Sequence, residues 1–270
     1  MGVLNVTPDS FSDGGRYASF DDAVGHAADM WADGADLIDV GGESTRPGAN
    51  RVEVSEEVRR VVPVVKSLAA QGISVSVDTY RAAVAAAGLA AGARVINDVS
   101  GGLGDPDMRR VIRDAGCPWI LMHWRGHSRV MQQLAHYDDV VADVRRELLQ
   151  RVAAAEQAGV DPSRLVIDPG LGFAKTAEHN WELLAHLDAL IDTKLPVLIG
   201  ASRKSFLGSL LADADGKPRD VNQREHATVA LTSYAALRGV WGVRVHEVRP
   251  NVDAARTIAA VQQRAGRRES

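Results

Sequence analysis

The chain has 270 residues, and its 31 Lys and Arg against 35 Asp and Glu give a formal net charge of −4 at pH 7. A mildly acidic chain without a run of basic residues is not typical of a nucleic-acid-binding protein or of a membrane-surface helix. Its 46% hydrophobic and 24% charged residues are typical of a folded soluble domain. The single cysteine, Cys117, excludes an intramolecular disulfide and a cysteine-based zinc site.

The sequence also lacks the features of an exported or membrane-spanning chain. No apolar run approaches the ~18 residues of a membrane span. The first residues, Met1 to Asn5, contain neither a basic region nor a cleavage motif, so we expect a cytoplasmic protein that binds neither nucleic acid nor a membrane.

One local pattern recurs along the chain: a helical stretch ends at a glycine, an apolar run follows, and the run ends at a polar residue. Gly72, for example, leads through residues 73–77 to Asp78. A glycine after a helix favours a left-handed cap, and a continuous apolar run is typical of a strand buried on both faces. We therefore predict eight strands, near residues 2–6, 36–40, 73–78, 94–98, 118–123, 164–168, 196–200 and 242–246.

The segments between these runs have helical periodicity, as Val144, Leu148 and Val152 illustrate. Eight strand–helix units of about 34 residues predict a single (β/α)8 TIM barrel, one domain spanning residues 1–270. A doubly wound open sheet is the alternative, but it would normally show a Gly-rich turn after the first strand, where this chain has Thr-Pro-Asp-Ser-Phe. Long loops are expected after strands 1, 2 and 5, at residues 7–19, 41–54 and 124–137.

Polar residues close nearly every predicted strand, and in a barrel of this type the active site lies at these carboxyl ends. An Asp that closes one strand is more often a cap for the next helix, and that alternative stays open for Asp39. It explains the whole set poorly, because eight strand ends in order carry such groups: Asn5, Asp39, Asp78, Asn97, His123, Asp168, Ser202 with Lys204, and Arg244 with His246.

The residue types indicate a flat heterocycle and an anion. Asp78 and Asp168 each offer a carboxylate that could accept two parallel hydrogen bonds from an aminopyrimidinone-like edge, and Asn97 suits a mixed donor and acceptor edge. Lys204 brings positive charge to the same end, where barrels commonly bind phosphate.

A diphosphate is the anion that these residues fit. Arg244 and His246 are two apart on a predicted strand and so should point the same way; with Asn5 they could hold a diphosphate. For Arg244 the alternative is a barrel-interior salt bridge with an Asp. The Asn5 oxygen suits a magnesium ion that is shared with a substrate phosphate.

Three loops could cover a ligand. Asp13 lies in the irregular loop after the first strand, where a simple turn with local hydrogen bonds is the alternative. Thr45 and Arg46 follow two glycines after the second strand, where the alternative is an exposed loop with a solvated Arg. Gly170 to Lys175 is a weak Gly-x-Gly segment in which Phe173 could form an apolar wall.

These motifs together resemble the dihydropteroate synthase family of the folate pathway, in its actinobacterial form. The resemblance covers essentially the whole chain, although a few residues before the first strand look missing, so we expect a short natural extension before Met1. It rests on residues 1–15 (MGVLNVTPDSFSDGG), 39–48 (DVGGESTRPG), 77–79 (VDT), 96–102 (INDVSGG), 168–173 (DPGLGF), 202–204 (SRK) and 244–246 (RVH).

The resemblance implies that 6-hydroxymethyl-7,8-dihydropterin diphosphate condenses with p-aminobenzoate to give 7,8-dihydropteroate and pyrophosphate. It implies Mg2+ on Asn5, a homodimer, and competition by sulfonamides. Catalytic roles would fall to Asp13, Arg46, Arg244 and His246. The pterin would be held by Asp78, Asn97, Asp168 and Lys204, and the diphosphate by Arg244, His246 and Asn5. The p-aminobenzoate pocket would be shaped by Thr45, Arg46, Pro47, Phe173, Ser202 and Arg203.

Two other functions remain open alternatives. A pterin-binding barrel of the methyltransferase kind would use Asp78, Asn97 and Asp168 but would not need the diphosphate residues. A non-catalytic pterin-binding paralogue should have lost a residue such as Asn5 or Arg244, and this chain keeps both. For the synthase we predict a dissociative substitution, in which pyrophosphate departs before the arylamine attacks.

Overall fold

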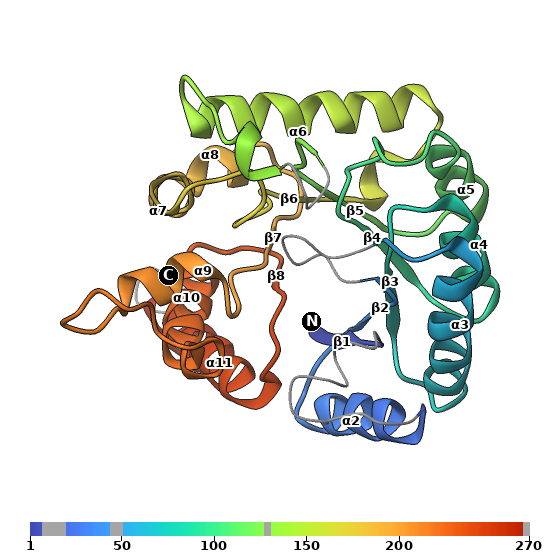
Figure 1. The fold of residues 1–270 in the computed structure, drawn as a ribbon, viewed down its shortest axis with the longest axis horizontal. Helices are drawn as coiled ribbons and strands as arrows, with labels where there is room; N and C mark the ends of the chain where they lie inside the picture. Colours follow the sequence, from blue (N-terminus) through green and yellow to red (C-terminus); the bar gives the residue numbers. More distant parts are fainter. Residues whose placement is uncertain (7–19, 44–50, 127–130, 267–270) are drawn as a thin grey trace.

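The computed structural model describes residues 1–6, 20–43, 51–126 and 131–266, and strands and helices alternate along it (Figure 1). The strands are β1 (Gly2–Asn5), β2 (Ile38–Gly41), β3 (Val75–Asp78), β4 (Val95–Asp98), β5 (Trp119–Met122), β6 (Leu165–Asp168), β7 (Leu198–Ile199) and β8 (Gly242–Val243). The helices are α2 (Phe20–Ala32), α3 (Val54–Ala70), α4 (Ala82–Ala90), α5 (Met108–Ala115), α6 (Val140–Gln157), α7 (Ala177–Ala185), α8 (Asp188–Ile191), α9 (Ser205–Leu210), α10 (Glu225–Leu237) and α11 (Val248–Gly266), with short 3-10 helices at Met131–Leu134, Pro162–Arg164 and Val221–Gln223.

The eight strands form the predicted (β/α)8 barrel. Strands β1 to β6 pair in parallel in chain order, and β7 pairs with β8. Two single-residue parallel bridges join these groups, Ile167 to Val197 and Gly2 to Val245. The last two strands are shorter than predicted, because regular pairing is confined to two residues in each.

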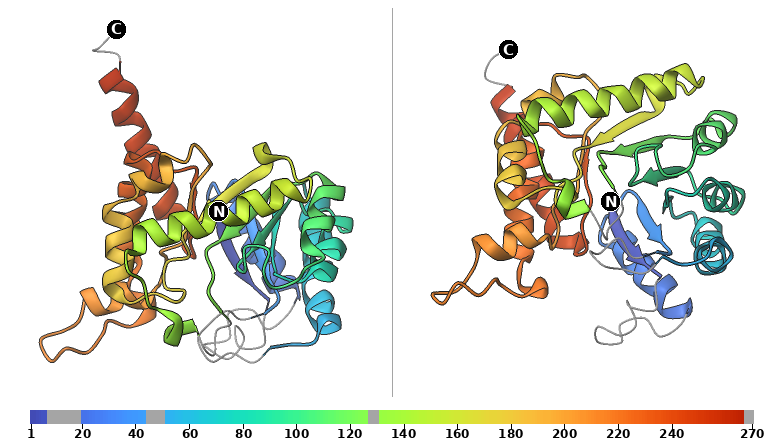
Figure 2. Two further views of the ribbon diagram at one scale, coloured as in Figure 1. Left: turned by 90° about the horizontal axis from the view of Figure 1, so that it is seen from above. Right: turned by 45° about the horizontal axis from the view of Figure 1, so that its top comes forward.

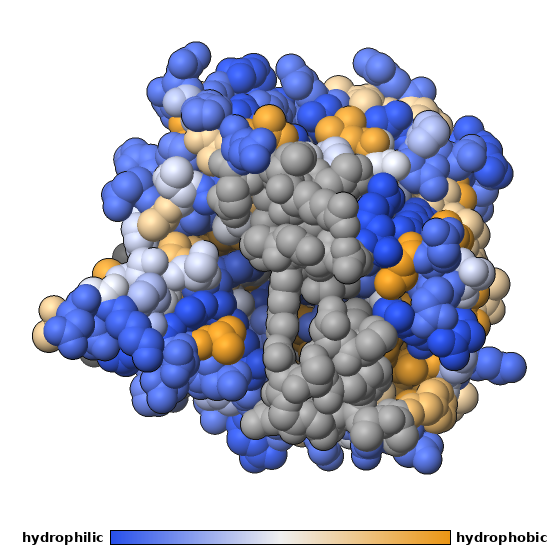
Figure 3. Space-filling model, viewed as in Figure 1, coloured by the Kyte–Doolittle hydropathy of each residue, from blue (hydrophilic) through white to orange (hydrophobic). Residues whose placement is uncertain are grey.

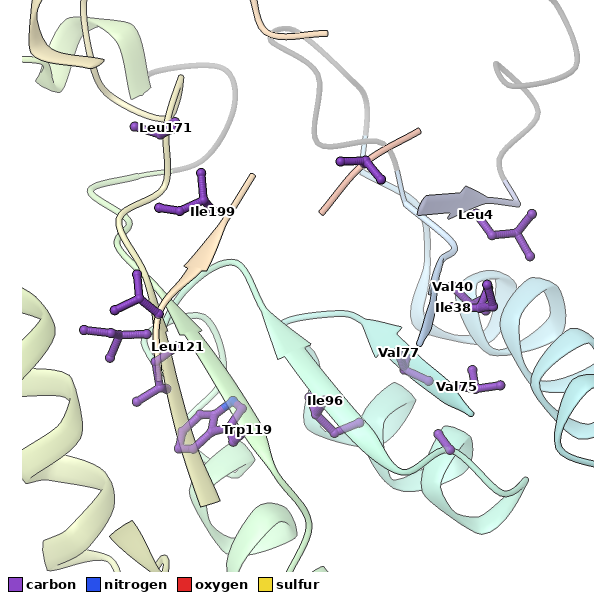
Figure 4. Packing of buried hydrophobic residues seen from close by; sticks show 14 of the residues in the cluster. Leu4, Ile38, Val40, Val75, Val77, Ile96, Trp119, Leu121, Leu171 and Ile199 are labelled. Carbon is purple, nitrogen blue, oxygen red and sulfur yellow. The ribbon is translucent and has the colours of Figure 1, made fainter. Parts of the chain in front are cut away.

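Strand alternation sorts the buried side chains into two apolar layers. The larger layer lies between the strands and the surrounding helices, and Figure 4 shows its labelled members, among them Val77, Ile96 and Trp119, on the strands that face those helices. The smaller layer fills the inside of the barrel. It contains Leu37, Val95, Ile120, Val166 and Leu198, with Met1 packed against it.

The glycines predicted to cap helices have the backbone conformation that this role requires. Gly34, Gly72, Gly92, Gly116 and Gly159 all have positive φ. Before the last strand, the glycine that follows the helix is Gly239, at φ 76° after α10, whereas Gly242 begins β8. Positive φ is strained for residues with a side chain, so glycine is the favoured residue at each of these turns.

Two parts of the chain extend from the barrel. The last helix, α11, runs beyond the rest of the molecule (Figure 2). The connection between α9 and α10 forms a mostly hydrophilic projection (Figure 3), as its exposed residues 213–220 explain. None of the described helices is long and apolar enough to cross a membrane.

Candidate active site

A polar layer lies directly above the apolar floor of the barrel. Two residues beyond floor residues Leu37, Val95 and Val166, the same strands present the buried side chains of Asp39, Asn97 and Asp168. Side chains two apart on a strand share a face, so these polar groups line the inside of the barrel at its carboxyl end. Strand periodicity therefore explains both the floor and the polar groups that stand on it.

Arg244 holds the centre of this layer. Its Nε donates to Asp39 Oδ2 at 2.6 Å and one terminal nitrogen donates to Asp78 Oδ2 at 2.7 Å. Asn97 Nδ2 also donates to Asp39 Oδ2, at 3.0 Å. The alternative of a helix cap at Asp39 is wrong, because this fully buried carboxylate bonds Arg244 and Asn97 instead. Arg244 does form the interior salt bridge that was its alternative role, and this salt bridge holds its guanidinium at the site.

Burial sets the protonation of these groups. It raises the pKa of Asp78 to about 7 against the opposing effect of Arg244. Burial also raises the pKa of Asp168 and, with the charge of Arg244, lowers that of Lys204 to about 8. Burial alone would lower the pKa of Arg244, but Asp39 and Asp78 raise it, so the guanidinium stays charged. The layer thus combines three buried carboxyls with two half-buried cations, an arrangement suited to a polar, charged ligand.

The segment after β6 brings Phe173 beside this layer. Asp168 Oδ1 accepts a hydrogen bond from the Gly170 N–H at 2.7 Å. Lys204 Nζ lies 4.1 Å from the centroid of the Phe173 ring, a cation–π contact. The structure therefore brings Lys204, which follows β7, close to two predicted residues of the β6 segment, Asp168 and Phe173.

His246 has a different partner from Arg244. The His246 Nδ1 atom lies 2.9 Å from Ser202 Oγ, whereas Arg244 contacts Asp39 and Asp78. Arg203 donates to Glu247 at 2.6 Å and has positive φ, 61°. The predicted pair of Arg244 and His246 is therefore split between two sets of contacts at the same end of the barrel.

Asn5 lies close to the Arg244 carboxylates. Gly41 has no side chain, and a Cβ atom built there would lie 3.6 Å from both Asn5 Oδ1 and Asp78 Oδ2. Because position 41 has no side chain, the Asn5 and Asp78 oxygen atoms face one small space. Asp13, Thr45, Arg46 and Pro47 lie outside the described residues, so their predicted roles stay predictions.

The described ends of the loop after β2 are held by a buried ion-pair network that the sequence analysis missed. Arg81 donates to Glu43 at 2.8 Å and to Glu57 at 2.9 Å, and Glu43 also accepts from the Val52 N–H at 3.1 Å. The Glu43 carboxylate is therefore hydrogen-bonded to the backbone of residue 52, at the other described end of this loop. No spacing rule relates Glu43 to Arg81, 38 residues away.

A second missed network lies behind the Gly170–Phe173 segment. Lys175 Nζ lies 2.9 Å from His123 Nδ1, and His123 Nε2 lies 3.0 Å from Glu147, which also pairs with Arg125. Burial lowers the pKa of Lys175 to about 7 and, with the charge of Lys175, that of His123 to about 4. The sequence offered two separate signals: a lysine within an apolar, glycine-rich segment, and, 52 residues before it, a histidine that closes a strand.

The same fold and motifs occur in known proteins. Residues 1–246 match the model of the pterin binding enzyme family. A dihydropteroate synthase from Mycobacterium leprae is 59% identical over 261 residues, which cover 96% of this chain and 92% of the relative. The structure of Xanthomonas albilineans dihydropteroate synthase with 4-aminobenzoic acid is similar at a TM-score of 0.88 and 47% identity, covering 97% of this chain and 92% of that one. The Yersinia pestis enzyme in a sulfonamide drug complex has a TM-score of 0.91 and 43% identity, with 97% and 94% covered.

Proposed function

Because this chain belongs to the pterin-binding enzyme family and is a transferase with dihydropteroate synthase activity, we propose that the polar layer around Arg244 is where its two substrates meet. The observation that carries the proposal is the buried contact of Arg244 with Asp39 and Asp78 at the carboxyl end of the barrel. A guanidinium that already binds two oxygen anions is suited to bind a diphosphate in the same fork geometry.

The pterin ring binds to Asp78, Asn97, Asp168 and Lys204 in this proposal. The carboxylates accept hydrogen bonds from the N–H groups of the ring, and the amide and the ammonium serve its acceptors. Phe173 forms an apolar wall beside Lys204. Arg244 uses Oδ2 of Asp78, so the carboxylate serves the ring with its other oxygen.

Arg244, His246 and Asn5 bind the diphosphate in the same proposal, and Mg2+ binds with it. The Asn5 amide oxygen fits Mg2+, because it faces the space left by Gly41, and this ion is usually held by one or two protein oxygens together with substrate phosphates. Within the described ranges, no three His, Cys, Asp or Glu side chains lie together so that they could hold a metal ion. When bound, Mg2+ would neutralise charge on the leaving pyrophosphate.

We propose a dissociative substitution at the pterin methylene carbon. Its bond to the diphosphate oxygen breaks, and the electron pair leaves with pyrophosphate, whose charge Arg244 and His246 stabilise. The carboxylates of Asp78 and Asp168 stabilise the cationic pterin. The nitrogen of p-aminobenzoate then forms the new C–N bond and loses one proton. A neutral arylamine already carries a free electron pair, so the step needs no general base.

Phe173, Ser202 and Arg203 shape the p-aminobenzoate pocket in this proposal, together with Thr45, Arg46 and Pro47. Arg203 supplies a cation for the carboxylate of p-aminobenzoate, and its present partner is Glu247. Asp13 and Arg46 close the site over both substrates. Because a sulfonamide resembles p-aminobenzoate, it would bind the same pocket.

The activity itself is tested by pyrophosphate release. Purified chain, given pterin diphosphate, p-aminobenzoate and Mg2+, should release one pyrophosphate for each dihydropteroate formed. A sulfonamide should raise the apparent KM for p-aminobenzoate and leave kcat unchanged, since it competes only for that pocket. If the chain releases no pyrophosphate from the two substrates, or releases it without forming dihydropteroate, the proposed site chemistry is wrong.

The proposal includes a single domain over residues 1–270 that works in the cytoplasm as a homodimer. The one cysteine, Cys117, is a buried free thiol, as is usual in a reducing compartment. Leu237, Trp241 and Val261 are each more than half exposed at the ends of α10 and α11. Such neighbouring apolar side chains favour an interface between two copies. Sedimentation at micromolar concentration should show a dimer, and a monomer would contradict this part.

A further inference from the structure

Lys175 is a buried lysine whose amine is fully used by the protein itself. Its side chain extends from the segment after β6, and the residue is only 3% exposed. The Nζ atom lies 3.0 Å from the Phe173 carbonyl oxygen, 3.2 Å from the Gly170 carbonyl oxygen and 2.9 Å from His123 Nδ1. The two carbonyl bonds need only two N–H donors, which both the ammonium and the neutral amine supply.

The segment that Lys175 binds has a backbone that needs such support. Gly170 and Gly172 have positive φ, and so does Ala174, at 48°, which is unfavourable for a residue with a side chain. Side chains from elsewhere hold two more of its polar groups: Asn180 accepts from the Gly172 N–H at 2.7 Å, and Tyr137 donates to the Ala174 carbonyl at 2.9 Å. The conformation therefore depends on side-chain bonds as well as on one backbone turn bond, from the Phe173 N–H to the Gly170 carbonyl at 3.0 Å.

The opposite side of this segment contacts the proposed pterin site. The Gly170 N–H fixes one oxygen of Asp168, and the Phe173 ring contacts Lys204. A Cβ atom at Gly172 would lie 3.1 Å from Lys204 Cδ, so the backbone approaches that lysine closely. Any displacement of the Gly170 and Phe173 carbonyls would therefore move groups that touch Asp168 and Lys204.

A chain of contacts anchors Lys175 to the barrel wall. His123 follows β5. Its Nδ1 is hydrogen-bonded to Lys175, and its Nε2 is hydrogen-bonded to Glu147 on α6 at 3.0 Å. Glu147 also pairs with Arg125, whose guanidinium stacks on the Tyr137 ring at 3.8 Å. The amine is thereby tied to elements other than the segment that it supports.

From these contacts we propose that Lys175 is a positioning residue, which holds residues 170–174 so that Asp168 and Phe173 are preorganised for the pterin. Lys175 does not touch the substrate in this role; it acts through the two carbonyls. The inference rests on the proposed pterin site, and the experiment below separates failure of one from failure of the other.

The decisive variant is Lys175→Met, which keeps an unbranched side chain, one atom shorter, and removes all of its donors. The Kd of the folded variant for 6-hydroxymethyl-7,8-dihydropterin diphosphate should rise at least tenfold by calorimetry, with a stoichiometry still near one site per chain. Amide hydrogen exchange should accelerate within residues 169–176 and stay unchanged in β1 to β4. Lys66→Met is the matched control, since Lys66 is exposed on α3, and it should change neither measurement.

Lys175→Arg keeps the proposal testable if the Met variant does not fold, because it retains a buried cation with several donors. This variant should restore slow exchange in residues 169–176 together with most of the affinity. A Met variant with unchanged affinity, or an Arg variant with slow exchange but the same loss of affinity as Met, would overturn the positioning role. Asp168→Asn distinguishes the two proposals: if it binds the pterin normally, the proposed pterin site is wrong, whatever Lys175 does.

Discussion

Replacing Arg244 with Ala should reduce turnover on the order of a hundredfold or more, the usual effect of removing a group that stabilises charge in the transition state. Arg244 is the cation at the centre of the polar layer, and its planar fork already binds two carboxylates. The loss should appear in kcat, because the charge on the departing pyrophosphate is greatest as the bond breaks. Steady-state pyrophosphate release measures it, and normal turnover of the Ala variant would remove Arg244 from the mechanism.

The same substitution should also destabilise the fold, because it leaves Asp39 and Asp78 buried without their cation. Breaking a buried ion pair from one side costs about 3–5 kcal/mol. The pKa of Asp78, already raised to about 7 by burial, should rise further without Arg244. A carboxyl with a raised folded pKa favours folding below its unfolded pKa and loses that contribution as pH rises through the folded value.

The stability loss of the Arg244→Ala variant should therefore be larger at pH 8 than at pH 5, as urea unfolding measures. Arg244→Lys retains the charge without the fork, so it should recover more stability than turnover. Arg110→Ala, at an exposed position on α5, is the control for loss of an arginine and should leave both quantities unchanged. A stability loss that does not depend on pH would contradict the explanation that Asp39 and Asp78 cause it as buried carboxylates without their cation.

Replacing Asp168 with Asn should weaken pterin binding about 30-fold, corresponding to ~2 kcal/mol, because an amide nitrogen would face a donor of the ring. The Asn oxygen can still accept from the Gly170 N–H, so the segment after β6 should keep its conformation. Burial raises the pKa of Asp168, which means that its ionised form costs stability. The Asn variant should therefore be no less stable than the original chain at pH 7.

Calorimetry with the pterin diphosphate and urea unfolding separate these two expectations. Asp192→Asn is the matched control, since Asp192 is exposed just after α8, and it should bind the pterin normally. Unchanged affinity in the Asp168→Asn variant would contradict the proposed role of this carboxylate. A large loss of stability in the Asp168→Asn variant would instead indicate that it binds the pterin weakly because it is poorly folded.

The sequence by itself was sufficient to predict where most of the barrel strands lie. The glycine, apolar run and polar end of each unit are local features, and β1 to β6 begin and end within two residues of the predictions. The strand ends also identified Asp78, Asn97 and Asp168 as candidate ligands, because parallel strands of a barrel end on one face. These features depend on neighbouring residues and on a fixed strand period, which a sequence displays directly.

The tertiary structure decided which of these groups meet. Arg244 lies 205 residues from Asp39, and no local pattern distinguishes a diphosphate ligand from a buried salt bridge at that position. Lys175 joins His123 across 52 residues, and His246 joins Ser202 across 44. Such pairings arise because burying a polar or charged group without a partner costs free energy. Each buried group therefore pairs with a group that closure of the barrel brings next to it. The sequence thus determined the barrel and the chemistry available at its carboxyl end, while closure of the barrel determined how those groups are paired.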